Sequence, residues 1–135
     1  MSARRKARKR ALDFLYEADI RGATALSLLS ERPAEELSQG DYVRELLVGV
    51  EEHLSKIDEL ITTYAQGWDM DRLPAVDRNI LRLGIYEIVW SSDLDDGIAI
   101  DEALTLAKEL STDESAGYIH GVLGRISSIK ESIAI

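Results

Sequence analysis

The residues with the clearest capacity for chemistry are six cationic side chains within the seven-residue run from Arg4 to Arg10. Guanidinium and ammonium groups at this density attract the phosphates of a nucleic acid. The whole chain has 16 basic and 25 acidic residues, so only ten basic side chains accompany the 25 acidic ones beyond this run. A polyanion is therefore expected to dock at this basic arm and to be repelled elsewhere.

Signatures of catalysis or of a metal site are absent from the sequence. There is no Cys, which excludes disulfides, thiolate metal sites and thiol nucleophiles. The two histidines, His53 and His120, are far apart and belong to no spaced set of metal ligands. We find no phosphate-binding glycine loop, no dinucleotide-binding turn and no nucleophile elbow. The sequence predicts a protein that is not an enzyme and that has no cofactor and no metal.

Helical periodicity runs through almost the whole chain, without sustained alternation of apolar and polar residues. The first helix is expected to begin after Ser2 as its N-cap and to end near Ile20, before Gly22. At about 100° per residue its small and apolar side chains gather on one face. That face, which we expect to be buried, holds Ala7, Ala11, Phe14, Leu15 and Ala18.

The later segments extend this pattern. We expect a short helix over 25–31 stopped by Pro33. The stretch from Asp41 to Tyr64, capped by Asp41, is one long helix or, as we favour, two helices with a break near 53–55, where Ser55 is a good cap. A helix over 76–90 is apolar nearly all round, which is typical of the middle of a bundle. Two more are expected over 98–110 and from a capping box at Ser111 and Glu114 onward.

The predicted fold class is therefore all-α, a single compact bundle of about six or seven helices. A chain of 135 residues is long enough to form one hydrophobic core without a disulfide or a structural metal. We expect one domain over residues 1–135, with residues 1–10 as a basic arm leading into the first helix. No run approaches the roughly 18 apolar residues of a membrane span, so a soluble, intracellular protein is expected.

The arm belongs to an amphipathic helix, which holds its charges in a fixed array. Arg5 and Lys9 share a helical face with Tyr16, two turns further on. Single-stranded RNA is bound by this combination, because unpaired bases stack on aromatic rings while cations follow the backbone. Duplex DNA is less favoured, since no groove-reading helix is evident. A frayed, solubilising terminus and a nuclear-import signal both remain open.

Three blocks of sequence, in order and spanning nearly the whole chain, carry a resemblance to a known family. The first is Arg4-Arg5-Lys6-Ala7-Arg8 leading to Leu15-Tyr16-Glu17, and the second runs from Val76 to Glu87. The third combines Ala99-Ile100-Asp101-Glu102-Ala103 with the segment from Tyr118 to Leu123. Together they resemble the bacterial transcription antitermination factors of the NusB family.

The resemblance implies an all-helical, non-catalytic, cytoplasmic factor. It would bind the single-stranded boxA element of nascent rRNA together with NusE, a small-subunit ribosomal protein, and act on the RNA polymerase antitermination complex. By position, the expected phosphate contacts are Arg4, Arg5, Arg8, Lys9 and Arg10. The positions expected near the RNA path are Tyr16, Glu114, Ser115 and Tyr118. The acidic positions expected to face the ribosomal protein are Asp71 and Asp77.

The sequence departs from the family pattern at three positions. Asp101 and His120 stand where Asn is expected, and Tyr118 stands where Phe is more common. Structural alternatives also exist: Tyr16 and Tyr118 as half-buried core rings, and Asp77 as an acid favoured by the helix dipole. At the level of function, the alternatives are a homodimeric or protein–protein adaptor with an occluded RNA surface, or an accessory module of an rRNA methyltransferase system.

Overall fold

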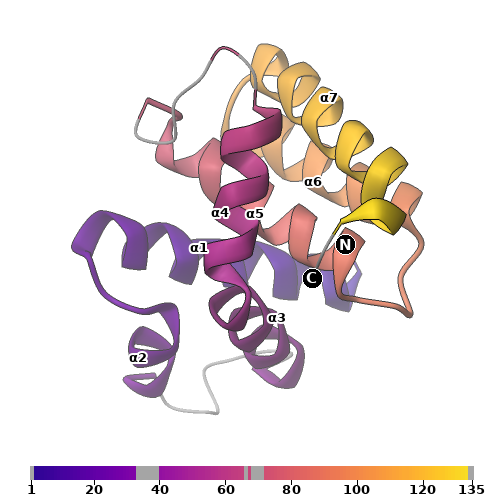
Figure 1. Ribbon diagram of the computed structural model, residues 1–135. Coiled ribbons are helices and arrows are strands. Elements are labelled where there is room, and N and C mark those ends of the chain that lie inside the picture. Colours follow the sequence, from indigo (N-terminus) through magenta and orange to yellow (C-terminus); the bar gives the residue numbers. More distant parts are fainter. Residues whose placement is uncertain (1, 33–39, 66, 68–71, 134–135) are drawn as a thin grey trace.

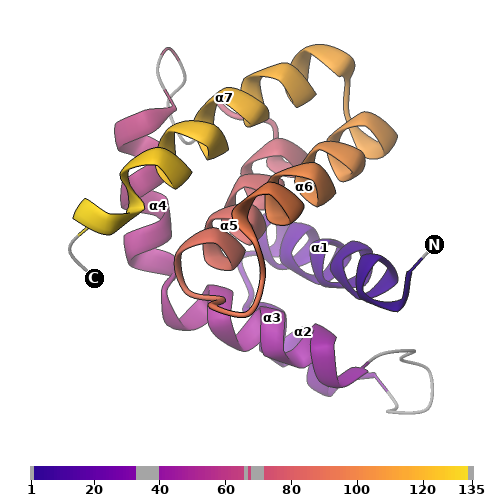
Figure 2. The same ribbon diagram turned by 90° about the vertical axis from the view of Figure 1, so that its right-hand side faces the viewer.

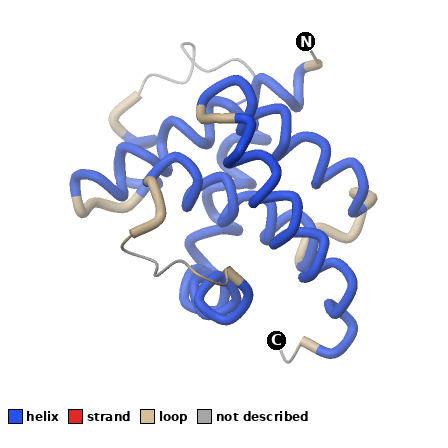
Figure 3. Tube along the Cα trace, turned by 90° about the horizontal axis from the view of Figure 1, so that it is seen from above, coloured by secondary structure: helices blue, strands red, loops and turns tan. Residues whose placement is uncertain are grey.

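The computed structural model describes residues 2–32, 40–65, 67 and 72–133, and these residues form helices joined by short connections (Figures 1 and 3). No strand occurs among them, which confirms the predicted all-α class. None of the described helices is long and apolar enough to cross a bilayer. The elements are α1 (Ala3–Arg21), α2 (Ala25–Ser30), α3 (Gly40–Glu52), α4 (Leu54–Tyr64), α5 (Ala75–Val89), α6 (Asp96–Leu110), α7 (Asp113–Ile129) and a closing 3-10 turn, η2 (Lys130–Ser132).

Both ends of α1 follow the sequence prediction. Ser2 is the N-cap, and its hydroxyl accepts a hydrogen bond of 3.1 Å from the backbone N–H of Arg5. Gly22 ends the helix in the left-handed conformation at φ 68°, where a side chain would be strained. The five residues expected on the buried face are all buried, so that prediction is confirmed.

Three predicted caps are wrong. The break between α3 and α4 occurs at His53, so Ser55 lies inside α4, and Asp41 lies in the first turn of α3 rather than before it. The His53 ring stacks on Trp90, with centroids 4.2 Å apart, which holds the break against the end of α5. At α7, Thr112 is the N-cap instead of Ser111, because Thr112 has the extended backbone that lets its Oγ1 accept from the Ser115 N–H.

Helix α5 is the centre of the bundle and contacts α1, α3, α4, α6 and α7 (Figure 2). Its apolar side chains are buried or half-buried on every side, as its sequence predicts. The approach to α3 is close: a Cβ added at Gly49 would lie 2.1 Å from Cε1 of the Tyr86 ring. Helices α6 and α7 pack together on one side of α5, and α1, α2 and α3 pack together on the other.

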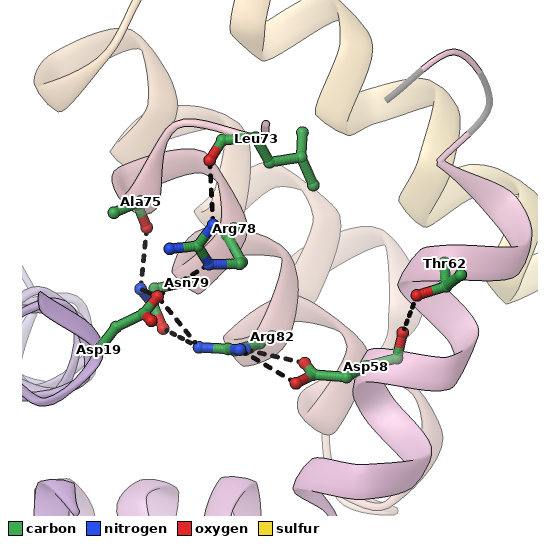
Figure 4. Close-up of polar contacts among 8 residues, drawn as sticks. All are labelled: Asp19, Asp58, Thr62, Leu73, Ala75, Arg78, Asn79 and Arg82. Atoms are coloured by element: carbon green, nitrogen blue, oxygen red, sulfur yellow. Dashed lines mark hydrogen bonds and ion pairs between the residues drawn. The ribbon is translucent and has the colours of Figure 1, made fainter. Parts of the chain in front are cut away.

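A polar network joins α1, α4 and α5 at the edge of this core (Figure 4). Asp19 of α1 accepts hydrogen bonds from Arg78 Nε at 2.8 Å and from Asn79 Nδ2 at 2.9 Å. Arg82 joins Asp19 to Asp58 of α4, donating to both carboxylate oxygens of Asp58. Because the charged side chains of this network are only 13–31% exposed, their mutual hydrogen bonds satisfy polar atoms that water reaches only in part.

The network predicts a specific dependence of stability on pH. Burial raises the pKa of Asp19, but the hydrogen bonds from Arg78 and Asn79 and the nearby positive charges outweigh it, so the pKa lies below its ordinary value. A lowered carboxyl pKa stabilises the fold above the unfolded pKa of about 4, and this contribution is lost as the pH falls through the folded value. We expect Asp19→Asn to lower the free energy of unfolding at pH 7 by about 1.5–3 kcal/mol.

Urea titrations of the wild type and Asp19→Asn between pH 7 and pH 3 measure this directly. The difference between the two proteins should be constant above about pH 5 and should shrink as the pH falls below about 4. A difference that stays the same down to pH 3 would contradict the assigned role of the Asp19 charge.

Candidate nucleic-acid interface

The basic arm forms the first two turns of α1, and most of its outward cations face carboxylates on its own and neighbouring elements. Arg4 lies 4.0 Å from Asp93, and Arg10 lies 3.8 Å from Asp13 one turn along α1. Exposed ion pairs of this kind are weak and exchange readily with other partners. The arm is therefore an ordered array of cations whose present partners can be replaced.

Arg8 does not belong to that outward array. Its side chain is 3% exposed, and its Nε donates to both carboxylate oxygens of Glu87 at 2.9 and 3.0 Å. Its Nη1 donates to Glu102 at 3.1 Å, and Arg5 Nε donates to the other oxygen of Glu102 at 2.8 Å. The expectation that Arg8 contacts RNA phosphate is corrected by this burial: Arg8 attaches the arm to α5 and α6.

Tyr42 of α3 completes the buried cluster. Its hydroxyl donates to Glu87 at 3.0 Å, and its ring lies below the guanidinium of Arg4 at 4.7 Å. Burial and the negative charge of Glu87 raise the pKa of Tyr42 to about 12, so the hydroxyl stays protonated and remains a donor. The first turns of α1 are thus held by α3, α5 and α6 together.

Lys6 is a candidate RNA contact that we did not single out within the basic run. It is exposed, and no ion pair to it occurs within the described part of the chain. The signal for it was available, because Lys6 lies one residue after Arg5 and three before Lys9, on the polar arc of α1. Because Arg8 is buried, the cations of the arm that face outward are Arg4, Arg5, Lys6, Lys9 and Arg10.

Lys9 connects the arm to the end of α6. Its ammonium is within hydrogen-bonding distance of Glu109, and that bond together with the charge of Glu109 raises the pKa of Lys9. Glu109 stands three residues before Thr112, the cap of α7. Figure 2 shows this turn between α6 and α7 on the same side of the molecule as the beginning of α1. The arm and the start of α7 therefore lie on the same side of the molecule, with the end of α6 in contact with Lys9.

The aromatic ring required for stacking is available on α1. Tyr16 is 41% exposed, which favours the surface interpretation over a half-buried core ring. It lies two turns beyond Lys9 on the same helical face, as the sequence predicts. Cations and an exposed ring along one helix are the two ingredients of a single-stranded RNA surface.

Four further predicted site residues line one cavity of about 220 Å³ between the starts of α5 and α7. They are Asp77, Glu114, Ser115 and Tyr118. The sequence placed Asp77 toward a protein partner and the other three toward RNA, but the structure brings all four together. Asp71 lies outside the described residues.

Asp77 is not an open surface acid. It is 4% exposed, and its Oδ2 accepts a hydrogen bond of 2.8 Å from the hydroxyl of Ser115. Its position in the first turn of α5 also suits the positive end of the helix dipole. Glu114 is exposed at the rim and Tyr118 is half-buried. The cavity thus has a fixed carboxylate at its base, a second at its edge and an aromatic wall.

The basic arm and the cavity carry opposite charge. The arm attracts phosphate, whereas the two carboxylates of the cavity accept hydrogen bonds and favour cationic or donor groups.

Two residues stand where the family pattern has Asn, and both are exposed. Asp101 lies on α6 and His120 lies on α7. Among the described residues, no three His, Asp or Glu side chains are arranged to hold a metal ion.

Comparison with known proteins gives a consistent set of relatives. The model of the NusB family matches residues 5–128. The transcription antitermination protein NusB of a Nocardioides species is 50% identical over 135 residues, covering 99% of this chain and 100% of that protein. The NusB of Thermobifida fusca is 47% identical, covering 98% of this chain and 94% of its own length.

Solved structures agree with the sequence relatives. NusB of T. maritima superimposes with a TM-score of 0.85 at 31% identity, covering 98% of this chain and 99% of that one. A crystal structure of antitermination factors NusB and NusE in complex with double-stranded RNA contains a chain with a TM-score of 0.83 at 28% identity. That alignment covers 95% of this chain and 98% of the other.

Proposed function

The chain belongs to the NusB family, and from that premise we propose that it is an RNA-binding transcription antitermination factor. In this proposal the whole chain acts as one domain in the cytoplasm. It binds the boxA element of nascent rRNA together with NusE and acts on transcribing RNA polymerase. The protein supplies docking surfaces and performs no chemistry of its own.

The single observation that carries the proposal is the ordered array of outward cations on α1, beside an exposed Tyr16. The remainder of the chain is strongly acidic, so an RNA backbone finds attraction mainly along this helix. The buried Arg8 cluster fixes the direction of the helix before RNA arrives. Pre-ordered cations lose little conformational freedom on binding, which favours affinity.

The protein partner is expected on the acidic side of the same surface. The cavity that contains Asp77 and Glu114 lies at the starts of α5 and α7, and a basic ribosomal protein complements its charge. RNA on α1 and the ribosomal protein at the starts of α5 and α7 would then lie next to each other. This arrangement supports joint binding, in which each ligand strengthens the binding of the other.

The form of the RNA is part of the proposal. The related NusB–NusE crystal structure contains double-stranded RNA, whereas an exposed aromatic ring favours unpaired bases. We propose a single-stranded boxA-like segment as the preferred ligand of this chain, because Tyr16 can stack only on a base that is free of its partner strand.

Binding of a short single-stranded boxA-like RNA across a salt series, with and without NusE, tests the proposal. For single strands the slope of log affinity against log salt is about −0.7 per neutralised phosphate, so three to five contacts predict about −2 to −3.5. NusE should tighten binding, and a duplex of the same sequence should bind more weakly. Absence of binding in every condition would exclude the RNA adaptor.

A homodimeric or protein–protein adaptor with an occluded RNA surface is the competing function. Sedimentation of the protein with and without RNA separates the two. A dimer that fails to bind RNA and remains intact with NusE present would favour the competing function, whereas a 1:1 complex with RNA favours the adaptor proposed above.

A further inference from the structure

We propose that Glu109, on the last turn of α6, competes with RNA phosphate for Lys9 and thereby sets the affinity and salt dependence of RNA binding. This inference rests on the proposed function and concerns a residue of α6 that is outside the arm. Glu109 acts as a phosphate mimic supplied by the protein itself, which RNA must displace.

The geometry of the pair supports this exchange. The Lys9 ammonium and the Glu109 carboxylate are in direct contact, and both side chains are 38% exposed. The pair is therefore reachable from solvent, unlike the buried pair of Arg8 and Glu87. A carboxylate and a phosphate oxygen bind an ammonium group through the same kind of charge-assisted hydrogen bond. The ammonium group has three donors but a single positive charge, which Glu109 already compensates, so a phosphate gains the full charge of Lys9 only by displacing the carboxylate.

Neighbouring cations show the same arrangement more weakly. Arg4 faces Asp93 at 4.0 Å and Arg10 faces Asp13 at 3.8 Å, both at exposed positions. At these distances the pairs are looser than that of Lys9, so they resist displacement less. Lys6 has no such partner among the described residues. Arg5 is held by Glu102, whose side chain is only 11% exposed and also binds Arg8, so Glu109 is the strongest competitor among the pairs in which both partners are exposed.

Competition has a measurable electrostatic signature. While Glu109 stays beside Lys9, that cation neutralises no phosphate and releases no counterion from the RNA. Removing the carboxylate frees Lys9 to neutralise one phosphate, which should steepen the salt slope by up to about 0.7. Exposed ion pairs have coupling energies that correspond to about 1.4- to 5-fold in an equilibrium constant, so affinity should rise by that factor.

The experiment compares the wild type, Glu109→Gln, Lys9→Gln and the double variant, using a single-stranded boxA-like RNA in a salt series. Glu109→Gln should tighten binding by about 1.4- to 5-fold and steepen the slope. In the Lys9→Gln background the same change should give a smaller gain and no steeper slope, because the competing pair is already absent and only screened repulsion from RNA is relieved. If Glu109 had only a structural role, Glu109→Gln would leave the salt slope unchanged, and its effect on affinity would be the same in the wild type and in the Lys9→Gln background.

Glu59→Gln is the matched control. It removes one exposed carboxylate from a pair with Lys56 on α4, which Figure 2 places away from the beginning of α1. Because charges are screened over about 8–10 Å, it should change RNA affinity by less than about 1.3-fold.

The outcomes separate this inference from the function on which it rests. Wild-type binding with no change in Glu109→Gln, or an equal gain in the Lys9→Gln background, overturns the competition while leaving RNA binding intact. Failure of the wild type to bind RNA at any salt concentration overturns the proposed function and this inference together.

Discussion

Replacing Arg8 by methionine should lower the free energy of unfolding by about 3–5 kcal/mol, because it leaves the carboxylate of Glu87 buried without its cationic partner. Glu87 is 2% exposed and would retain only the hydroxyl of Tyr42. The ion pairs through which Arg8 connects α1 to α5 and α6 would be lost at the same time. Urea unfolding followed by circular dichroism measures the change.

Two comparisons define the cause. Arg4→Met removes a cation from the exposed part of the same arm and should change stability by less than about 0.5 kcal/mol. The double variant Arg8→Met with Glu87→Met should recover much of the loss, since a buried ion pair replaced by apolar side chains of similar size is often tolerated. If the double variant were as unstable as Arg8→Met alone, an unpaired Glu87 would not be the cause.

Reversing two outward charges, Lys6→Glu with Lys9→Glu, should weaken binding of single-stranded RNA by about 100-fold or more near 0.1 M salt. Each change removes a charge-assisted contact and adds repulsion from phosphate. The salt slope should become shallower by about 0.7 to 1.4, because Lys6 no longer neutralises a phosphate and Lys9, for which Glu109 competes, contributes at most one more. We choose Lys6 instead of Arg5 because Arg5 also holds Glu102, and its reversal would disturb the buried cluster.

The control is Lys56→Glu with Arg21→Glu, which makes the same change of net charge on α4 and at the far end of α1. Its salt slope should stay within about 0.3 of the wild-type value, since no arm contact is lost. Fluorescence anisotropy with labelled RNA measures both variants, and thermal unfolding establishes that each is folded. Equal loss in both variants would show that net charge, and not the arm, governs binding.

The behaviour of Arg8 shows where prediction from sequence succeeded and where it stopped. Arg8 precedes Ala11, Leu12 and Leu15 by three, four and seven residues, so helical spacing alone places it on the buried face of α1. We nevertheless expected it to contact phosphate, because it belongs to a continuous basic run. Its true partners, Glu87 and Glu102, are 79 and 94 residues away, and no local pattern connects them.

The proximity of the cavity residues was likewise predictable only in part from the sequence. Glu114, Ser115 and Tyr118 are close together on one helix, so their proximity follows from helical period. Asp77 lies 38 residues before Ser115, and their hydrogen bond exists because α5 and α7 cross at that point. The sequence indicated that both segments matter, yet it assigned them to different ligands.

Local sequence patterns were enough to predict the all-α class, the bounds and the apolar face of α1, the basic arm and the resemblance to the NusB family. These features depend on local backbone preferences and on the 3.6-residue period, and both are set by residues close together in the sequence. The packing of the helices determines which cations remain outward, which carboxylate each one faces and how the cavity is assembled. Ion-pair partners are selected by the packing of helices across the core, because charge interactions depend on distance in space and on exposure to water.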